Sequence, residues 1–72
     1  MITIHLNGKA QEVPEGLSLT ALLEFLKLPA DRVAVELNLE IVSKGNWDQA
    51  VIRAGDRLEV VHFVGGGLAI TP

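Results

Sequence analysis

A single run of leucines constrains the fold of this 72-residue chain more than any other feature. The leucines recur with the spacing i, i+3, i+4 and i+7, at positions 19, 22, 23 and 26. This spacing places them on one face of an α-helix, and so short a helix is marginal in water unless that face is buried. Ser18 stands where an N-cap hydroxyl would accept a hydrogen bond from the first helical amides, and Pro29 is expected to end the helix. We therefore predict one main helix that covers a sheet.

A hairpin is predicted before the helix. Residues 2–6 alternate apolar and polar side chains, which is the period-two pattern of a strand with one buried face. Asn7-Gly8 follows at once, and both residues tolerate the positive φ angles of a type I′ turn. Residues 9–13 are then expected to return as the antiparallel partner of the first strand.

Further strand patterns follow the helix. They cover residues 33–37, 40–42 and 57–63. The segment 53–56 is expected to make a turn before the last of these strands, in which Leu58 and Val60 would face the core. Residues 43–49 read as loop, with Trp47 as an anchor that packs on the core.

This order of elements, ββαββ with a short extra strand, predicts an α+β fold. The matching architecture is a ubiquitin-like β-grasp, in which a mixed sheet of about four to five strands packs on one main helix and the first and last strands commonly run parallel. A ferredoxin-like arrangement would need a second helix, but residues 43–50 contain Gly45 and no apolar stripe long enough to form one. Residues 1–64 are expected to form the β-grasp domain, and residues 65–72 a flexible glycine tail with a C-terminal extension.

Composition excludes several classes of function. The chain has no cysteine, so a disulfide framework, a thiolate nucleophile and a thiolate zinc site are impossible. Its net charge of −3 repels nucleic-acid phosphates, so we expect no nucleic-acid partner. A signal-peptide pattern and a membrane-spanning apolar run are both missing, and we expect a cytoplasmic protein with no membrane partner.

No catalytic constellation can be assembled from these residues. His5 and His62 are the only histidines, and two isolated imidazoles make neither a metal set nor a triad. The glycine cluster lacks the lysine that a phosphate-binding loop requires. We therefore expect a protein that is not an enzyme and that binds no metal or cofactor of its own.

The chemical feature of the chain is the segment Gly65-Gly66-Gly67. Three glycines weaken a strand, so the sheet is expected to stop near Val64. An extended chain from Val64 to Gly67 would span roughly 13–14 Å, and glycines without Cβ atoms can thread a narrow channel. The composition alone fits either a linker or frayed terminus, or a tail that enters the active site of another protein.

Several segments together resemble a known family. They are the opening hairpin with Asn7-Gly8, VAVELN at 33–38 leading to EIV at 40–42, Trp47, and GDRLEVVHFVGGG at 55–67. Over residues 1–67 the chain resembles the ThiS family, the ubiquitin-like sulfur carriers of thiamin biosynthesis.

The resemblance implies that Gly67 is the site of chemistry, with Gly65 and Gly66 as a flexible tail. In the family, an adenylating enzyme related to ubiquitin-activating enzymes uses ATP and magnesium to adenylate the terminal glycine carboxylate. A sulfur donor fed by a cysteine desulfurase then replaces the adenylate and leaves a thiocarboxylate. Thiazole synthase accepts that sulfur. Val61, Phe63 and Val64 are our candidates for contacts with the activating enzyme, with burial under a neighbouring loop as the alternative for Val61 and Phe63.

The sequence departs from the family pattern after Gly67, where Leu68-Ala69-Ile70-Thr71-Pro72 follow. These residues put the Gly67 carboxyl group in an amide bond, so we expect a protease to remove them. Cleavage after Gly66 would leave a similar diglycine end, and residues 68–72 could instead be the remnant of a longer fused or artificial chain. Two other functions stay open: a carrier like the small subunit of molybdopterin synthase, and a non-covalent ubiquitin-like binding module.

Overall fold

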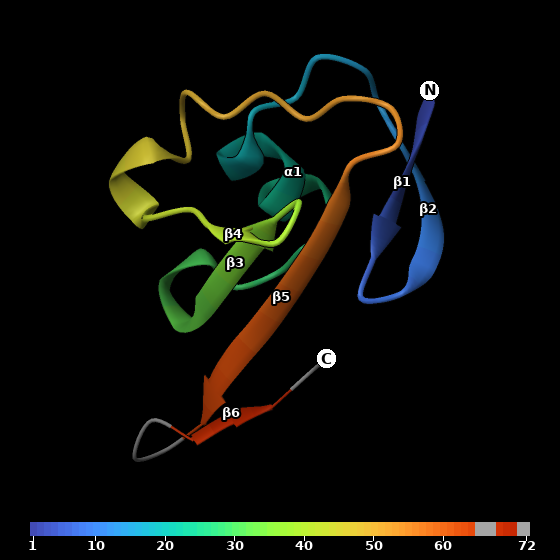
Figure 1. Ribbon diagram of the computed structural model, residues 1–72. Coiled ribbons are helices and arrows are strands. Elements are labelled where there is room, and N and C mark those ends of the chain that lie inside the picture. The colour runs from blue at the N-terminus through green and yellow to red at the C-terminus, as the bar shows by residue number, and fades with distance from the viewer. Residues whose placement is uncertain (65–67, 71–72) are drawn as a thin grey trace.

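The computed structural model describes residues 1–64 and 68–70 of the chain (Figure 1). Its helices are α1 (Leu19–Phe25) and two short 3₁₀ turns, η1 (Ala30–Arg32) and η2 (Lys44–Asn46). Its strands are β1 (Ile2–Leu6), β2 (Lys9–Val13), β3 (Val33–Leu37), β4 (Glu40–Ile41), β5 (Arg57–Val64) and β6 (Leu68–Ile70).

The strands form one mixed sheet with α1 against one of its faces (Figure 1). Five of them follow the order β2-β1-β5-β3-β4, and β6 pairs with β5 outside that path. β1 and β5 run parallel, with His5 opposite Arg57 and Leu6 opposite Leu58, whereas the other pairs are antiparallel. The predicted α+β architecture, a β-grasp, is confirmed. Strand β6 was not predicted.

The opening hairpin has the predicted tight turn. Asn7 and Gly8 have φ angles of 50° and 83°, the positive values that a type I′ turn requires. The register pairs Ile2 with Val13 and Leu6 with Lys9, so Ile4 and Val13 point into the core and the alternate residues point out. The turn residues thus determine which side chains of β1 and β2 are buried.

Helix α1 begins as predicted and ends earlier than predicted. The Ser18 hydroxyl accepts a hydrogen bond from the Ala21 amide at 3.1 Å. The helix stops at Phe25, four residues before Pro29, so the prediction that Pro29 ends it was wrong. The cause is a Schellman motif, in which Lys27 takes a φ of 59° and its amide donates to the Glu24 carbonyl at 3.0 Å. The Leu28 amide completes the motif by donating to the Leu23 carbonyl at 2.9 Å.

The core lies between α1 and the sheet. It consists of Ile4, Val13, Leu19, Leu22, Leu23, Val33, Val35, Trp47, Ile52, Leu58 and Val60. Trp47 is 3% exposed and its indole donates a 2.8 Å hydrogen bond to the Val42 carbonyl, so its predicted role as a loop anchor is confirmed. Among the residues whose burial the structure describes, no polar or charged residue is buried as a whole.

Candidate functional site

Strand β5 leads the chain away from the core and toward the glycines. Leu58 and Val60, in its first half, are buried against the helix side, as predicted. β1 pairs with β5 only at its start, and β3 pairs with it as far as His62. Six residues of strand span roughly 20 Å, so Val64 lies far along the strand from Leu58 (Figure 1). The chain therefore reaches Gly65 at one end of the sheet, while Gly65, Gly66 and Gly67 themselves lie outside the described residues.

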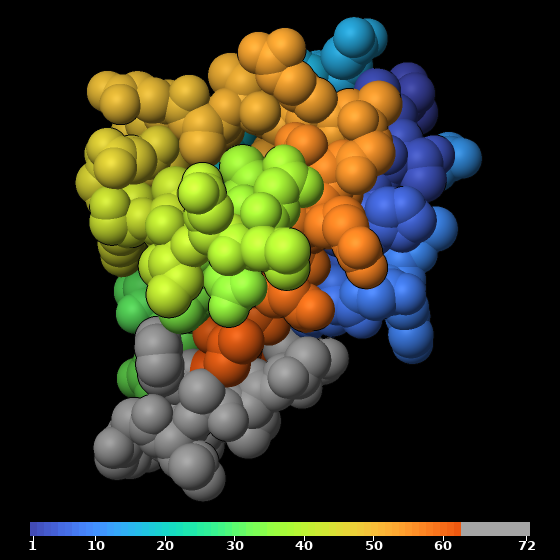
Figure 2. All heavy atoms as spheres, viewed as in Figure 1, coloured from blue at the N-terminus to red at the C-terminus, as the bar shows by residue number. Residues whose placement is uncertain are grey.

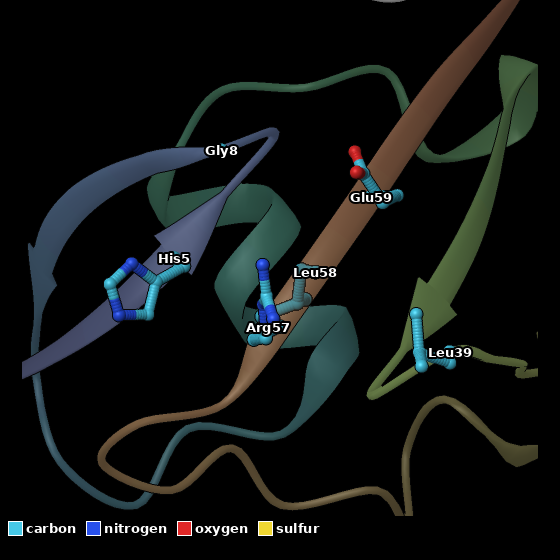
Figure 3. Close-up of a pocket in the computed structure, with 6 residues that line it drawn as sticks. All are labelled: His5, Gly8, Leu39, Arg57, Leu58 and Glu59. Atoms are coloured by element: carbon cyan, nitrogen blue, oxygen red, sulfur yellow. The ribbon is translucent and has the colours of Figure 1, made fainter.

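The face of the sheet opposite α1 lies at the surface of the molecule (Figure 2). Seen from this side in Figure 2, residues of the β3–β4 region and of β5 lie next to each other at the surface, and β1 follows β5. Figure 3 shows His5 from β1 and Arg57 and Glu59 from β5 on this face, with Leu39 from the β3–β4 turn beside them. They surround a shallow hollow of about 120 Å³, which is smaller than typical small-molecule sites. A protein surface suits this face better than a small ligand does.

Two large apolar side chains are exposed to solvent at the edge of this face. Leu39 is 83% exposed and Ile41 is 77% exposed. Asn38 and Leu39 form the two-residue turn between β3 and β4, with φ angles of 53° and 74°. Leucine at a position with positive φ is strained, because glycine or asparagine adopts that conformation at lower cost. Neither residue was predicted as a contact candidate from the sequence, although an apolar residue in a two-residue turn is a signal that points to Leu39.

The predicted contact residues are only partly described. Val61 is half-buried and lies opposite Ala34 of β3, on the face turned away from Leu58 and Val60. The side chains of Phe63 and Val64 lie outside the described part of the structure. The structure thus brings Val61 to the same sheet face as Leu39 and Ile41, and the contacts predicted for Val61, Phe63 and Val64 stay a prediction.

Like charges also face each other on this surface. Glu36 of β3 lies directly opposite Glu59 of β5, and Ile41 of β4 lies on the other side of Glu36. Carboxylates in directly opposed positions of an antiparallel pair repel each other. The face therefore combines apolar side chains at its edge with the opposed carboxylates of Glu36 and Glu59, and Arg57 lies next to Glu59.

The described residues contain no cluster that could hold a metal ion. No group of three or more His, Asp or Glu side chains gathers among them. His5 is exposed, and the Nε2 atom of His62 is buried without a hydrogen-bond partner among the residues described. A second hollow, lined by Glu15, Arg53 and apolar or glycine residues, offers no nucleophile. In the part of the chain that the structure describes, no helix is long and apolar enough to cross a membrane.

Comparison with known proteins identifies the family. The model of the ThiS family matches residues 4–67, which include the hairpin, the helix, all of β5 and the three glycines. The chain belongs to the ThiS family. The matched segment ends at Gly67, so residues 68–72 lie beyond the family match.

Individual ThiS relatives agree with this assignment. The sulfur carrier protein ThiS of Bacillus subtilis is 35% identical over 65 residues, which cover 89% of this chain and 98% of that protein. A crystal structure of the thiamine biosynthesis protein ThiS from Geobacter metallireducens is 38% identical and has a TM-score of 0.82, covering 92% of this chain and all of the other. The solved ThiS structure thus resembles this chain in both fold and sequence.

A thiazole synthase also matches. That of Magnetococcus marinus is 44% identical over 64 residues, or 89% of this chain. The chain spans only about a fifth of that protein, 20% of its length, and a similar share, 19%, of the thiazole synthase of Paramagnetospirillum magneticum. A segment like this chain therefore also occurs within larger proteins that bear the name thiazole synthase.

Proposed function

We propose that the chain is a sulfur carrier of thiamin biosynthesis and that the sulfur is attached at the carboxyl group of Gly67. The observation that carries this proposal is the family match, which runs through β5 and stops at Gly67. The similarity to the Bacillus subtilis sulfur carrier over nearly its whole length supports the same role. In this role the chain is a substrate of its partners and not a catalyst.

The chemistry takes place on the glycine tail. A carboxylate is a poor acyl donor until a good leaving group is attached. An adenylating partner of the ubiquitin-activating type, using ATP and magnesium, converts the Gly67 carboxylate to an acyl-adenylate and releases pyrophosphate. Hydrosulfide, released from the persulfide of a cysteine desulfurase by a thiol reductant that is oxidised to a disulfide, then attacks the acyl carbon, displaces AMP and leaves the thiocarboxylate. Covalent attachment keeps the sulfur from diffusing away before it is used.

We further propose thiazole synthase as the acceptor. Proteins of that name contain a segment 44% and 42% identical to this chain, which supports a working relationship between the two activities. Such a carrier must present its tail to two different enzymes in turn, and exposed apolar side chains grouped on one surface are typical of a protein interaction site. Val61, Leu39 and Ile41 are the described residues that we propose for these contacts, with Phe63 and Val64 as the remaining candidates.

The proposed cycle requires a free carboxylate at Gly67. Residues 68–72 follow Gly67, so their removal precedes adenylation in this proposal. The end of the family match at Gly67 favours cleavage there over cleavage after Gly66. We propose that the cycle takes place in the cytoplasm.

Intact-mass spectrometry tests the proposed function. The full chain and a version that ends at Gly67 are incubated with the adenylating enzyme, ATP, magnesium and a sulfur source. We expect the Gly67 version to exchange one oxygen for sulfur and the full chain to stay unchanged until residues 68–72 are removed. A matched control that ends at Gly65 keeps the domain but should form no thiocarboxylate, because its tail is too short.

The alternatives give different results in the same experiment. Thiocarboxylate that supports a molybdopterin synthase but not a thiazole synthase would assign the chain to the other sulfur-carrier branch. A Gly67 version that forms neither adenylate nor thiocarboxylate would refute the carrier role and favour a non-covalent binding module. A full chain that gains sulfur without losing residues would show that trimming is not required.

A further inference from the structure

The two edges of β5 are used differently. On one edge β3 pairs with β5 without interruption from Leu58 to His62. On the other edge β1 pairs only with Arg57 and Leu58, and the Asn7 amide donates to the Leu58 carbonyl at 2.8 Å. Beyond Leu58, β1 has turned away into its hairpin, so the rest of this edge needs another partner.

The side chain of Asn7 takes the next place on this edge. Its Oδ1 accepts a hydrogen bond from the Val60 amide at 2.8 Å, and its Nδ2 donates to the Val60 carbonyl at 3.3 Å. The carboxamide therefore pairs with Val60 as the backbone of a neighbouring strand would. Backbone groups alternate along a strand, so those of Leu58, Val60, His62 and Val64 all face this edge.

Strand β6 takes the remaining places. Its residues Leu68–Ile70 run antiparallel to β5, with Ile70 opposite His62 and Leu68 opposite Val64. Ala69 lies opposite Phe63, whose backbone groups face β3 by the same alternation. The edge of β5 at His62 and Val64 is thus covered by the segment that directly follows Gly67 in sequence (Figure 1).

We propose that the edge of β5 at His62–Val64 is a strand-pairing site that residues Leu68–Ile70 occupy until they are removed. Removal leaves the backbone groups of His62 and Val64 without a partner. The site then accepts an antiparallel, extended segment of a partner protein, in the way that peptides add to sheet edges. The proposal deepens the proposed function, and its trimming step rests on that function.

The chemistry of the occupant follows from the strand that the edge now holds. The sequence Leu-Ala-Ile carries no charge, and it is short, with three residues in the strand. A three-residue strand at a sheet edge is weakly held and opens locally far more often than the core unfolds. The site therefore suits an uncharged extended segment that binds weakly and leaves again, as a carrier that visits two enzymes in turn requires.

Hydrogen exchange of the full chain, followed residue by residue by NMR, tests whether β6 covers the edge. Proline replaces either Ile70, whose amide faces β5, or Ala69, whose amide faces away. Ile70→Pro should speed exchange of the His62 and Val64 amides on the order of tenfold, because it removes a pairing amide. Ala69→Pro, the matched control, should change them little, since proline is tolerated where the amide faces solvent. Equal exchange in the unsubstituted chain and in Ile70→Pro would overturn the proposal.

A second experiment tests the site as a docking edge. The chain cut after Gly67 is titrated with a synthetic peptide that has the sequence of residues 68–72. We expect amide shift changes at His62 and Val64 in the cut chain and none in the full chain, whose edge is occupied. Shift changes spread over the α1 face, or none at either amide, would overturn the docking part of the proposal.

These readouts do not depend on sulfur chemistry. Amide exchange and peptide binding report the pairing of β5 whether or not Gly67 is ever adenylated. A covered edge in a chain that never forms a thiocarboxylate would refute the proposed function alone. A thiocarboxylated chain with an uncovered edge would refute only the strand-pairing site.

Discussion

At the scale of single residues, two positions with positive φ have opposite relations to stability. Asn7 combines a φ of 50°, which asparagine tolerates, with two hydrogen bonds from its side chain to the backbone of Val60. Leu39 has a φ of 74° and an 83% exposed side chain. Asn7 thus supplies hydrogen-bond partners to the backbone of Val60. Leu39 has a strained backbone, and its side chain gains no burial that would offset the strain.

Replacing Asn7 tests the bridge to Val60. Asn7→Gly keeps the positive φ that the turn needs but leaves the Val60 amide and carbonyl without this partner. We expect the free energy of unfolding to fall by about 1–3 kcal/mol, measured by urea denaturation with Trp47 fluorescence. Asn7→Asp keeps the acceptor and loses the donor, so its loss should be smaller. An Asn7→Gly variant as stable as the parent would show that the bridge contributes nothing.

Replacing Leu39 tests whether strain is stored in the β3–β4 turn. Leu39→Gly should raise the free energy of unfolding by roughly 0.5–1 kcal/mol, because relief of the left-handed strain exceeds the entropy cost of glycine. Leu39→Ala removes the same exposed side chain but keeps the strain, so it should not stabilise the chain. Both variants should bind the adenylating enzyme more weakly in calorimetry if Leu39 is a docking residue. If Leu39→Ala raised the free energy of unfolding, the exposed leucine side chain, and not the φ angle, would be the source of the instability.

At the scale of elements, the ends of α1 depend on local hydrogen bonds and β5 depends on distant ones. Ser18 caps the start of the helix and the Schellman motif at Lys27 closes it, all within eleven residues of sequence, 18–28. β5 instead pairs with β1 from the start of the chain and β3 from its middle, and with β6, which follows it in sequence. The helix therefore forms from neighbours in sequence, whereas the strand that carries the tail is positioned by contacts of long range.

The helix cap gives a direct prediction. Ser18→Ala removes the acceptor of the Ala21 amide and should lower the free energy of unfolding by about 1 kcal/mol in urea denaturation. Ser43→Ala is the matched control, since Ser43 also precedes a helical turn but makes no capping hydrogen bond to the backbone there. Its effect should stay within about 0.5 kcal/mol. Equal losses in the two variants would argue against a specific role for the cap.

At the scale of the whole molecule, the core and the tail are separate. Among the residues whose burial the structure describes, the buried ones lie between Ile4 and Val60, and β6 adds three residues at one end of the sheet. The docking face, opposite α1, is formed by β5 and its neighbouring strands, and the glycine segment follows the end of β5 in sequence. A rigid domain thus holds a surface for partners at a fixed position relative to the start of the glycine segment.

This separation predicts that the tail is dispensable for folding. A chain that ends at Gly67 should unfold in one cooperative transition, with a free energy of unfolding within about 1 kcal/mol of the full chain. The change is small because β6 pairs with β5 over three residues only, and the described core residues from Ile4 to Val60 all remain. Urea denaturation followed by fluorescence and by circular dichroism checks both points. A truncated chain without a cooperative transition would mean that residues 68–72 belong to the folded domain.

Local features allowed much of the fold to be predicted from the sequence, and they single out the glycine segment, whose role stays a prediction. The leucine stripe, the Ser18 cap and the Asn7-Gly8 turn act over a few residues, so their outcome follows from the identity of those residues. Residues 65–67 stand out for the same reason, since three glycines in a row cannot support a strand interior. The helix end was missed because Lys27 adopts a left-handed conformation that its residue type does not announce.

Only the tertiary structure decided the rest. That Asn7 bonds to Val60, 53 residues away, depends on the parallel pairing of β1 and β5, which no local pattern encodes. The pairing of β6 with the remaining edge of β5, and the exposure of Leu39 and Ile41, depend on which strands lie next to one another. Sequence by itself determined the elements and the family, because both rest on residue identity in order along the chain. The structure determined the surfaces, because a surface is made by residues that are neighbours only in space.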